Sequence, residues 1–196
     1  MVATKTPKIA GKSVVLVTRL LSKQAQMSGQ IIPYQDSLDF SVKRDDDVTI
    51  TKTGKVTKPA DPESTIKTSF VENFSQIAKD LDFAVVDGDE LEFWILDYMY
   101  KKGEKYFARY MRGTISESQS SYDADDNAKR ELTITITEGP VPGWTPIPAD
   151  MEAELAFVFR GIGKIEGDAK NDGTDGGGEA YDRADDGGSV VMPETN

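Results

Sequence analysis

Apolar and polar side chains alternate along most of this chain, which is typical of β-strands that bury one face. In one stretch Leu38, Phe40 and Val42 are separated by polar residues, so all three share a face. The predicted strands span residues 13–21, 37–42, 65–71, 90–98, 105–113, 131–139 and 152–161. The last of them places three apolar side chains on one face: Leu155, Phe157 and Phe159.

One segment, residues 73–88, repeats its apolar residues at helical spacing instead. These residues are Phe74, Ile77, Ala78, Leu81, Ala84 and Val85. Asn73, with Gln76 three residues later, is a signal for the start of a helix, and Gly88 fits its end. One helix among about eight strands predicts a mainly β fold, a sandwich or barrel with one short α-helix on its flank.

A polar hairpin is predicted at residues 47–57, where Val48 and Ile50 alternate with polar side chains and residues 53–55 signal a turn. This long arm has little apolar surface with which to fold onto its own domain. Such arms commonly reach another subunit, but an ordinary surface hairpin would look the same in the sequence. Both interpretations stay open on these residues alone.

The composition changes near residue 164, which divides the chain into two predicted parts. Residues 165–196 hold seven glycines and nine acidic residues against two basic ones, and their few apolar side chains cannot form a core. We therefore expect residues 1–164 to form one β domain with an N-terminal arm, and residues 165–196 to be a disordered acidic tail. That tail would either project outside as a solvated fringe or act as an electrostatic clasp that docks on Lys5, Lys8 and Lys12 of a neighbouring subunit.

The absence of two residue types excludes several catalytic mechanisms and one kind of metal site. The 196 residues include no histidine and no cysteine, so a Ser-His-Asp triad, a thiol nucleophile and a Cys/His zinc site are impossible. The net charge of −11 argues against a protein that grips nucleic acid through its phosphates. No apolar run is long enough to span a membrane, and no signal peptide is evident, so we expect synthesis in the cytoplasm.

Two acidic runs could suggest a metal site, but neither has the right pattern. Residues 45–47 are three consecutive aspartates, which alternate between the faces of a strand. Residues 123–127 resemble the start of a calcium loop, but Ala128 and Ile134 stand where glycine and glutamate are required.

Trp94 lies within an apolar strand and is expected to pack in a core or interface. We therefore expect no catalytic residues, no metal and no cofactor, and predict that the chain is not an enzyme.

The order of these pieces resembles the major tail protein (tail tube protein) family of siphophages. The resemblance covers roughly residues 8–164 and rests on GKSVVLVTRLL, QDSLDFSVKRDDDVTITKTGK, ELEFWILDY, ELTITITEG and DMEAELAFVFRGIG. Some members carry a C-terminal immunoglobulin-like domain, for which the 32 residues after position 164 are too few.

This resemblance implies a structural virion protein that forms hexameric rings, which stack into a tail tube around a tape measure protein. Genomic DNA would pass non-specifically through the tube, and tail terminator and distal tail proteins would bind its ends. The resemblance also implies that the hairpin at residues 43–58 reaches a neighbouring ring. The predicted stacking residues are Lys43, Arg44, Asp45, Asp46, Asp47, Lys52, Lys55 and Lys58.

Three other functions remain possible for such a sequence. A head–tail connector or tail terminator shares the fold class but usually forms a single ring. A non-viral β-sandwich would bind a ligand or sugar. A small β-rich hydrolase would use paired carboxylates, although no constellation of them is visible.

Overall fold

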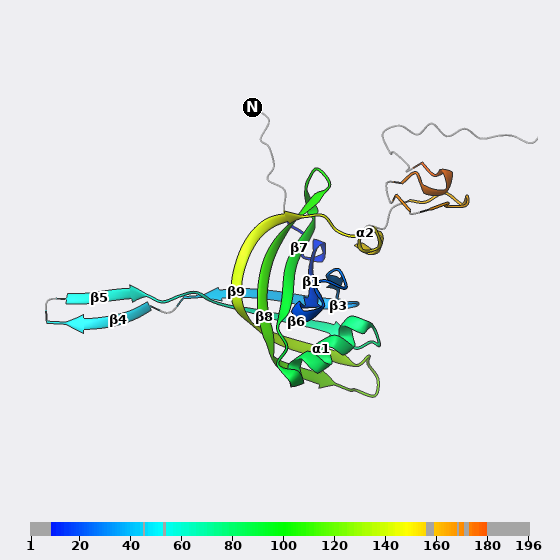
Figure 1. Cartoon of the computed structure of the whole chain (residues 1–196). Coiled ribbons are helices and arrows are strands. Elements are labelled where there is room, and N and C mark those ends of the chain that lie inside the picture. Colours follow the sequence, from blue (N-terminus) through cyan, green and yellow to red (C-terminus); the bar gives the residue numbers. More distant parts are fainter. Residues whose placement is uncertain are drawn as a thin grey trace, which may run out of the picture. The chain divides into compact units, whose positions relative to one another are not determined.

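The computed structural model describes residues 9–44, 46–52, 54–155, 159–167, 169–170 and 173–179. The chain divides into two compact units, Met1–Pro146 and Ile147–Asn196. The first unit contains a large β-sheet, one helix and the hairpin arm (Figure 1). No helix in the described ranges combines the length and the apolar character needed to cross a membrane.

The first unit is built on one antiparallel sheet of seven strands, in the order β2-β1-β7-β8-β9-β6-β3. The strands are β1 Val14–Leu20, β2 Gln30–Ile31, β3 Gln35–Lys43, β6 Glu63–Val71, β7 Leu91–Lys102, β8 Lys105–Ser121 and β9 Lys129–Thr145. The sheet curls so that β1 and β3 approach each other, and the Leu16 amide donates a hydrogen bond to Gln35 Oε1 at 3.0 Å. The predicted mainly β fold is confirmed, with a single curled sheet at its centre.

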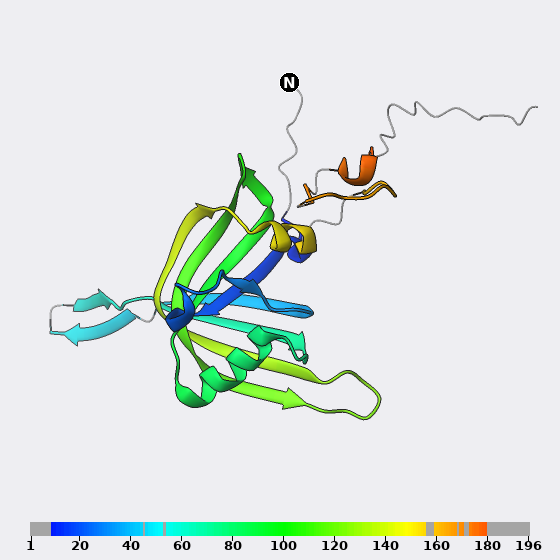
Figure 2. The ribbon, with the colours of Figure 1, turned by 45° about the vertical axis from the view of Figure 1, so that its right-hand side comes forward.

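The alternation in the sequence places the core on the concave side of this sheet. In β6 and β9, Ile66, Phe70, Leu132 and Ile134 are fully or almost fully buried in one cluster, as the period-two pattern predicts. The helix α1, Gln76–Asp87, covers this cluster with its own apolar stripe (Figure 2). Burial of both stripes therefore holds the helix on the sheet.

The flanking helix was predicted correctly, but it begins later than expected. Its N-cap is Ser75, whose hydroxyl accepts a hydrogen bond from the Ala78 amide at 3.2 Å. Asn73 Oδ1 instead accepts a hydrogen bond from the Ser75 amide at 3.1 Å. Because Phe74 precedes this cap, it is not on the helical stripe and is 94% exposed, contrary to the prediction that it packs inside.

Strand β7, in the interior of the sheet, is covered on both of its faces. Phe93 and Ile95 are buried in the core cluster, while Leu96 is buried on the opposite face and Trp94 is half-buried there. The loop before β2 lies over that second face: a Cβ on Gly29 would be 3.2 Å from the Trp94 ring. The continuous apolar run of this strand therefore reflects two covered faces.

The predicted last strand, residues 152–161, is wrong in its first part. Residues Ala149–Leu155 form a short helix, α2, in the second unit. Phe157 lies outside the described residues, and Phe159 is exposed and not in a strand. The segment contains only good helix formers apart from Asp150. The acidic side chains in its first turn interact favourably with the helix dipole and so stabilise the helix.

The second unit also contains a close contact between glycine-rich segments. The Gly161 amide donates to the Asp175 carbonyl at 2.7 Å, and the Gly163 amide donates to the Gly176 carbonyl at 3.0 Å. A Cβ on Gly161 would lie 2.3 Å from the Gly176 carbonyl oxygen, so only glycine allows this approach. The composition boundary after residue 164 falls inside this unit.

Candidate assembly surfaces

The most distinctive surface feature of the first unit is a hairpin arm. Strands β4, Asp46–Thr51, and β5, Gly54–Pro59, form a separate two-stranded sheet and, within the described ranges, pair only with each other. The arm continues from the last pair of the main sheet, Lys43 opposite Glu63, and both ribbon views show it extending away from that sheet (Figures 1 and 2). The predicted polar hairpin is therefore confirmed and is slightly longer than expected.

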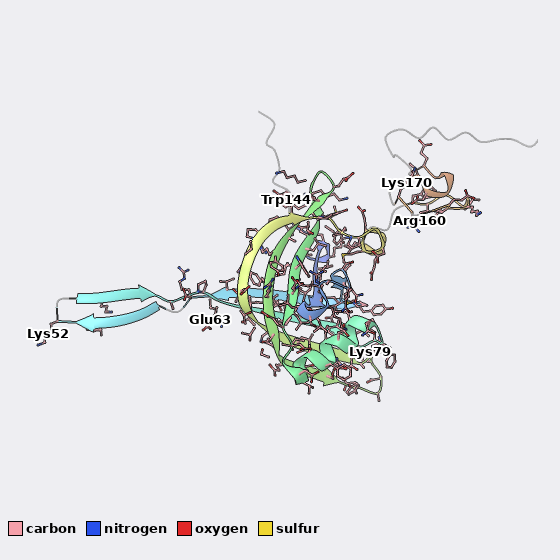
Figure 3. All side chains as sticks on the ribbon, viewed as in Figure 1. Lys52, Glu63, Lys79, Trp144, Arg160 and Lys170 are labelled. Carbon is pink, nitrogen blue, oxygen red and sulfur yellow. The ribbon has the colours of Figure 1, made fainter. Side chains whose placement is uncertain are left out.

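The predicted stacking residues are distributed along this arm from base to tip. Lys43 and Arg44 lie at its base with exposed side chains, and Lys52 lies at its tip (Figure 3). Asp46 and Asp47 belong to β4, Lys55 and Lys58 belong to β5, and Asp45 lies outside the described residues. Ile50, opposite Lys55 in the hairpin, is 77% exposed, so the arm presents an apolar side chain next to its cations.

The curled sheet leaves a seam between β1 and β3. A cavity of 650 Å³ opens there, and its apolar lining includes Val14, Leu38, Phe40 and Ile95. Among the described residues, β3 pairs with β6 alone, so its other backbone edge makes no ladder. An unpaired edge beside an apolar cavity is a surface on which other chains can add strands.

The outer face of the sheet over β3, β6, β8 and β9 is polar. It forms a shallow groove of 370 Å³ lined by serine, threonine and three carboxylates: Asp39, Glu117 and Glu131. Lys67 is the one lysine in that lining. The charge of this surface is therefore mainly negative, which denies a nucleic acid the phosphate contacts on which its binding depends.

A second part of the outer face is held by buried polar contacts. Glu92, on β7, accepts hydrogen bonds from Arg19 Nε at 2.6 Å and from Tyr110 Oη at 2.7 Å. Arg112 Nε in turn donates to Tyr110 Oη at 2.7 Å. Burial, and then the hydrogen bond that the hydroxyl donates to Glu92, raise the pKa of Tyr110. These contacts hold β1, β7 and β8 in one arrangement.

Another cluster, around the buried Arg130, ties the helix to the sheet. Arg130, on β9, forms ion pairs with Glu72 at 2.8 Å and with Asp82 of α1 at 2.5 Å. Ser120 also donates to Glu72 Oε1 at 2.7 Å. Burial alone would raise the pKa of Glu72, but the hydrogen bonds from Ser120 and Arg130 outweigh it and hold that pKa below its ordinary value.

Exposed aromatic residues at the two ends of the sheet were not predicted as functional. Tyr100 and Trp144 lie at one end with their ring centroids 5.1 Å apart, and Phe74, Phe83 and Tyr122 surround a groove at the other. The only sequence signal was that aromatic residues stood beside the turn and the loop. Within the described ranges, no group of three or more acidic side chains could hold a metal ion.

No protein-family model and no curated protein matches this sequence. The structure is similar to a chain of the SPP1 tail tube, solved by solid-state NMR and cryo-EM, with a TM-score of 0.60 at 14% identity. That match covers 87% of this chain and 98% of the other.

Two further similar structures come from gene transfer agent particles. One is from the tail of an empty particle, with a TM-score of 0.53 at 12% identity, and the other is from a native virion, with a TM-score of 0.50 at 12% identity. Each match covers 69% of this chain and 98% of the other. These neighbours are tail and virion components, not enzymes, and the chain has the tail tube fold.

Proposed function

We propose that this chain is the subunit of a phage tail tube, in which hexameric rings stack around a lumen. The observation that carries the proposal is the likeness to an SPP1 tail tube chain over 98% of that chain's length. The gene transfer agent tail was refined with C6 symmetry, which supports six subunits in each ring. The unpaired edge of β3 and the cavity beside it offer a surface for joining neighbouring subunits.

The hairpin arm is the proposed contact between rings. Its strands form a sheet separate from the main one, so the arm is available to a second copy without opening the main sheet. Exposed Lys52, Lys55 and Ile50 near its tip provide both charge and apolar surface for that contact. An edge contact repeated around a ring and an arm contact between rings together produce a closed, stacked assembly.

The same proposal assigns the other partners. The tube would enclose a tape measure protein, pass genomic DNA non-specifically, and end on terminator and distal tail proteins in the virion after synthesis in the host cytoplasm. The acidic groove on the sheet supports the passage of DNA, because a negative surface gives phosphates nothing to bind. The siphophage type is proposed from the sequence resemblance.

Electron microscopy of the purified protein across a range of concentrations tests this proposal. We expect tubes of stacked rings for the full chain. Deleting residues 45–57 and bridging the gap with glycines should leave a folded subunit that does not stack. Monomers at every concentration would contradict the tube, and single rings from the full chain would favour a connector or terminator. Tubes from the deletion variant would contradict only the role of the arm.

A further inference from the structure

One end of the sheet is basic and carries exposed aromatic surface. Here the turn between β7 and β8 places Lys102 directly opposite Lys105, and like charges in such a pair repel each other. Lys102 Nζ lies 5.9 Å from the centroid of the Trp144 ring, which packs edge-on against Tyr100. Met99, beside them, is 73% exposed. We call Met99, Tyr100, Lys102, Lys105 and Trp144 the basic end.

The loop between β8 and β9, at the other end of the sheet, is acidic, and exposed aromatic side chains lie beside it. Phe74, Phe83 and Tyr122 are 94%, 65% and 72% exposed, and they surround a groove of 570 Å³ between α1 and the loop that joins β8 to β9. That loop contains Asp123 and Asp125, both exposed and, within the described part of the chain, without an ion pair. We call these five residues the acidic end.

The two ends are the opposite ends of the same pair of strands. Strands β8 and β9 are 17 residues long each and pair with each other along most of that length. At about 3.3 Å per residue, roughly 50 Å of strand lies between the basic end and the acidic end. Both ribbon views show the β7–β8 turn and the β8–β9 loop at opposite extremes of the sheet, and Figure 3 places Trp144 near that turn and Lys79 on α1 near that loop.

We propose that the basic end of one copy docks on the acidic end of a second copy in the next ring. The proposal rests on the proposed function, and it adds a contact that does not use the arm. The two surfaces complement each other in charge. Because they lie at opposite ends of the same strands, one copy cannot bring its own two surfaces together. A contact between two different surfaces repeats head to tail, which is the geometry of stacked rings.

The physical basis of the contact is both apolar and electrostatic. Aromatic side chains with large exposed areas gain free energy when a partner covers them, and they are enriched in interfaces. Asp123 and Asp125 of one copy would lie near Lys102 and Lys105 of the next. The carboxylates would then relieve the repulsion between the two lysines. Opposite charges also select the head-to-tail orientation over head-to-head contacts, which would bring like charges together.

Variants that reverse the sign of the charged side chains at one end or the other test this contact. The basic-end variant carries Lys102→Glu and Lys105→Glu, and the acidic-end variant carries Asp123→Lys and Asp125→Lys. All four residues are exposed, so both variants should fold, as circular dichroism and the unfolding midpoint can check. Each variant alone would bring like charges together, and the concentration needed for tubes should rise about tenfold, the change that ~1.4 kcal/mol produces.

Mixing the two variants in equal amounts should restore tubes, because each end of one variant then meets an opposite charge on the other. The quadruple variant should also form tubes by itself. Lys67→Glu lies in the middle of β6, away from either end, and changes the net charge by half as much as the basic-end variant, so it should assemble like the original chain. This control separates the contact from a general effect of charge.

The outcomes distinguish this inference from the proposed function. A rise in the concentration needed for tubes in both single-end variants, with recovery in the mixture and in the quadruple variant, supports the contact. If the full chain forms tubes and the single-end variants do so equally well, or if mixing restores nothing, the end-to-end contact is wrong while the tube remains. If the full chain forms no tubes under any condition, the proposed function fails and this inference fails with it.

Discussion

The carboxylate of Glu92 shows how single residues fix the arrangement of strands in this protein. Its side chain is 5% exposed and is compensated by Arg19 and by the Tyr110 hydroxyl. A buried ion pair of this kind adds little net stability, but removal of one partner leaves a charge that the interior solvates poorly. The contact therefore penalises any other placement of β1 on β7.

Replacement of Arg19 by methionine tests this interpretation. Arg19→Met keeps much of the apolar stem and removes the charge, so we expect the free energy of unfolding in urea to fall by about 1–3 kcal/mol, the cost of an uncompensated buried acceptor. The double variant Arg19→Met with Glu92→Gln should recover part of that loss, because no charge is then left buried. Equal losses in the single and double variants would show that Glu92 does not depend on Arg19.

Glu72 gives the protein a specific sensitivity to acid. Its folded pKa lies below the ordinary value of 4.5, so its ionised form stabilises the fold at neutral pH. That contribution disappears as the pH falls from about 4.5 through the lower folded pKa. Unfolding measured between pH 6 and pH 3 should therefore depend less on pH in Glu72→Gln than in the original chain. Ile134→Val, which is destabilised without losing a titrating group, should keep the original dependence.

At the level of elements, the end of α1 depends on one backbone conformation. Gly88 caps the helix with φ of 71°, a left-handed conformation that costs other residues about 1–2 kcal/mol. No heavy atom lies within 4 Å of a Cβ placed there, so Gly88→Ala should cost about 1 kcal/mol through the backbone alone. Gly11→Ala is the matched control, because it has the same free space without a positive φ. Thermal unfolding of both variants measures the difference.

The sequence predicted those elements whose side chains follow one period from start to end. The alternation around Ile134 and the helical spacing of Ile77 and Leu81 reflect burial of one face, which depends only on local geometry. The closure of the sheet was not predictable, because it depends on contacts such as Leu16 with Gln35 between distant strands. The error at α2 arose from the apolar residues near Phe157, which suggested alternation over a segment whose first half consists mainly of helix formers.

The candidate surfaces were predictable to different extents. The hairpin arm was found because a turn signal stood between two alternating polar segments, although its role in stacking stays a prediction. The basic and acidic ends were missed, because exposure of Phe74 follows from the position of a helix cap and that of Trp144 from the end of a strand. Composition gives the charge of each loop, but only the sheet order shows that the two loops lie at opposite ends.

At the scale of the whole molecule, the division into two units predicts independent folding of the first. Among the described residues, the buried core cluster has no member beyond Ile134, so all of its known members belong to Met1–Pro146. A chain that ends at Pro146 should therefore keep the sheet and a cooperative unfolding transition, as circular dichroism and urea titration can measure. An unfolded or aggregated product would show that the sheet requires residues of the second unit.

A chain that ends at residue 164 separates folding from the contacts of the second unit. It keeps Gly161 and Gly163 but loses Asp175 and Gly176, to whose carbonyls their amides donate. We expect hydrogen exchange at these two amides to become much faster while exchange in β6 and β9 stays slow, because unpaired backbone amides exchange by local opening.

Tube formation by this chain at low and high salt then tests the acidic segment. A defect that appears with a change in salt would indicate an electrostatic clasp, since such contacts are screened within ~8 Å at physiological ionic strength. Unchanged assembly would indicate that the segment acts only as a solvated fringe.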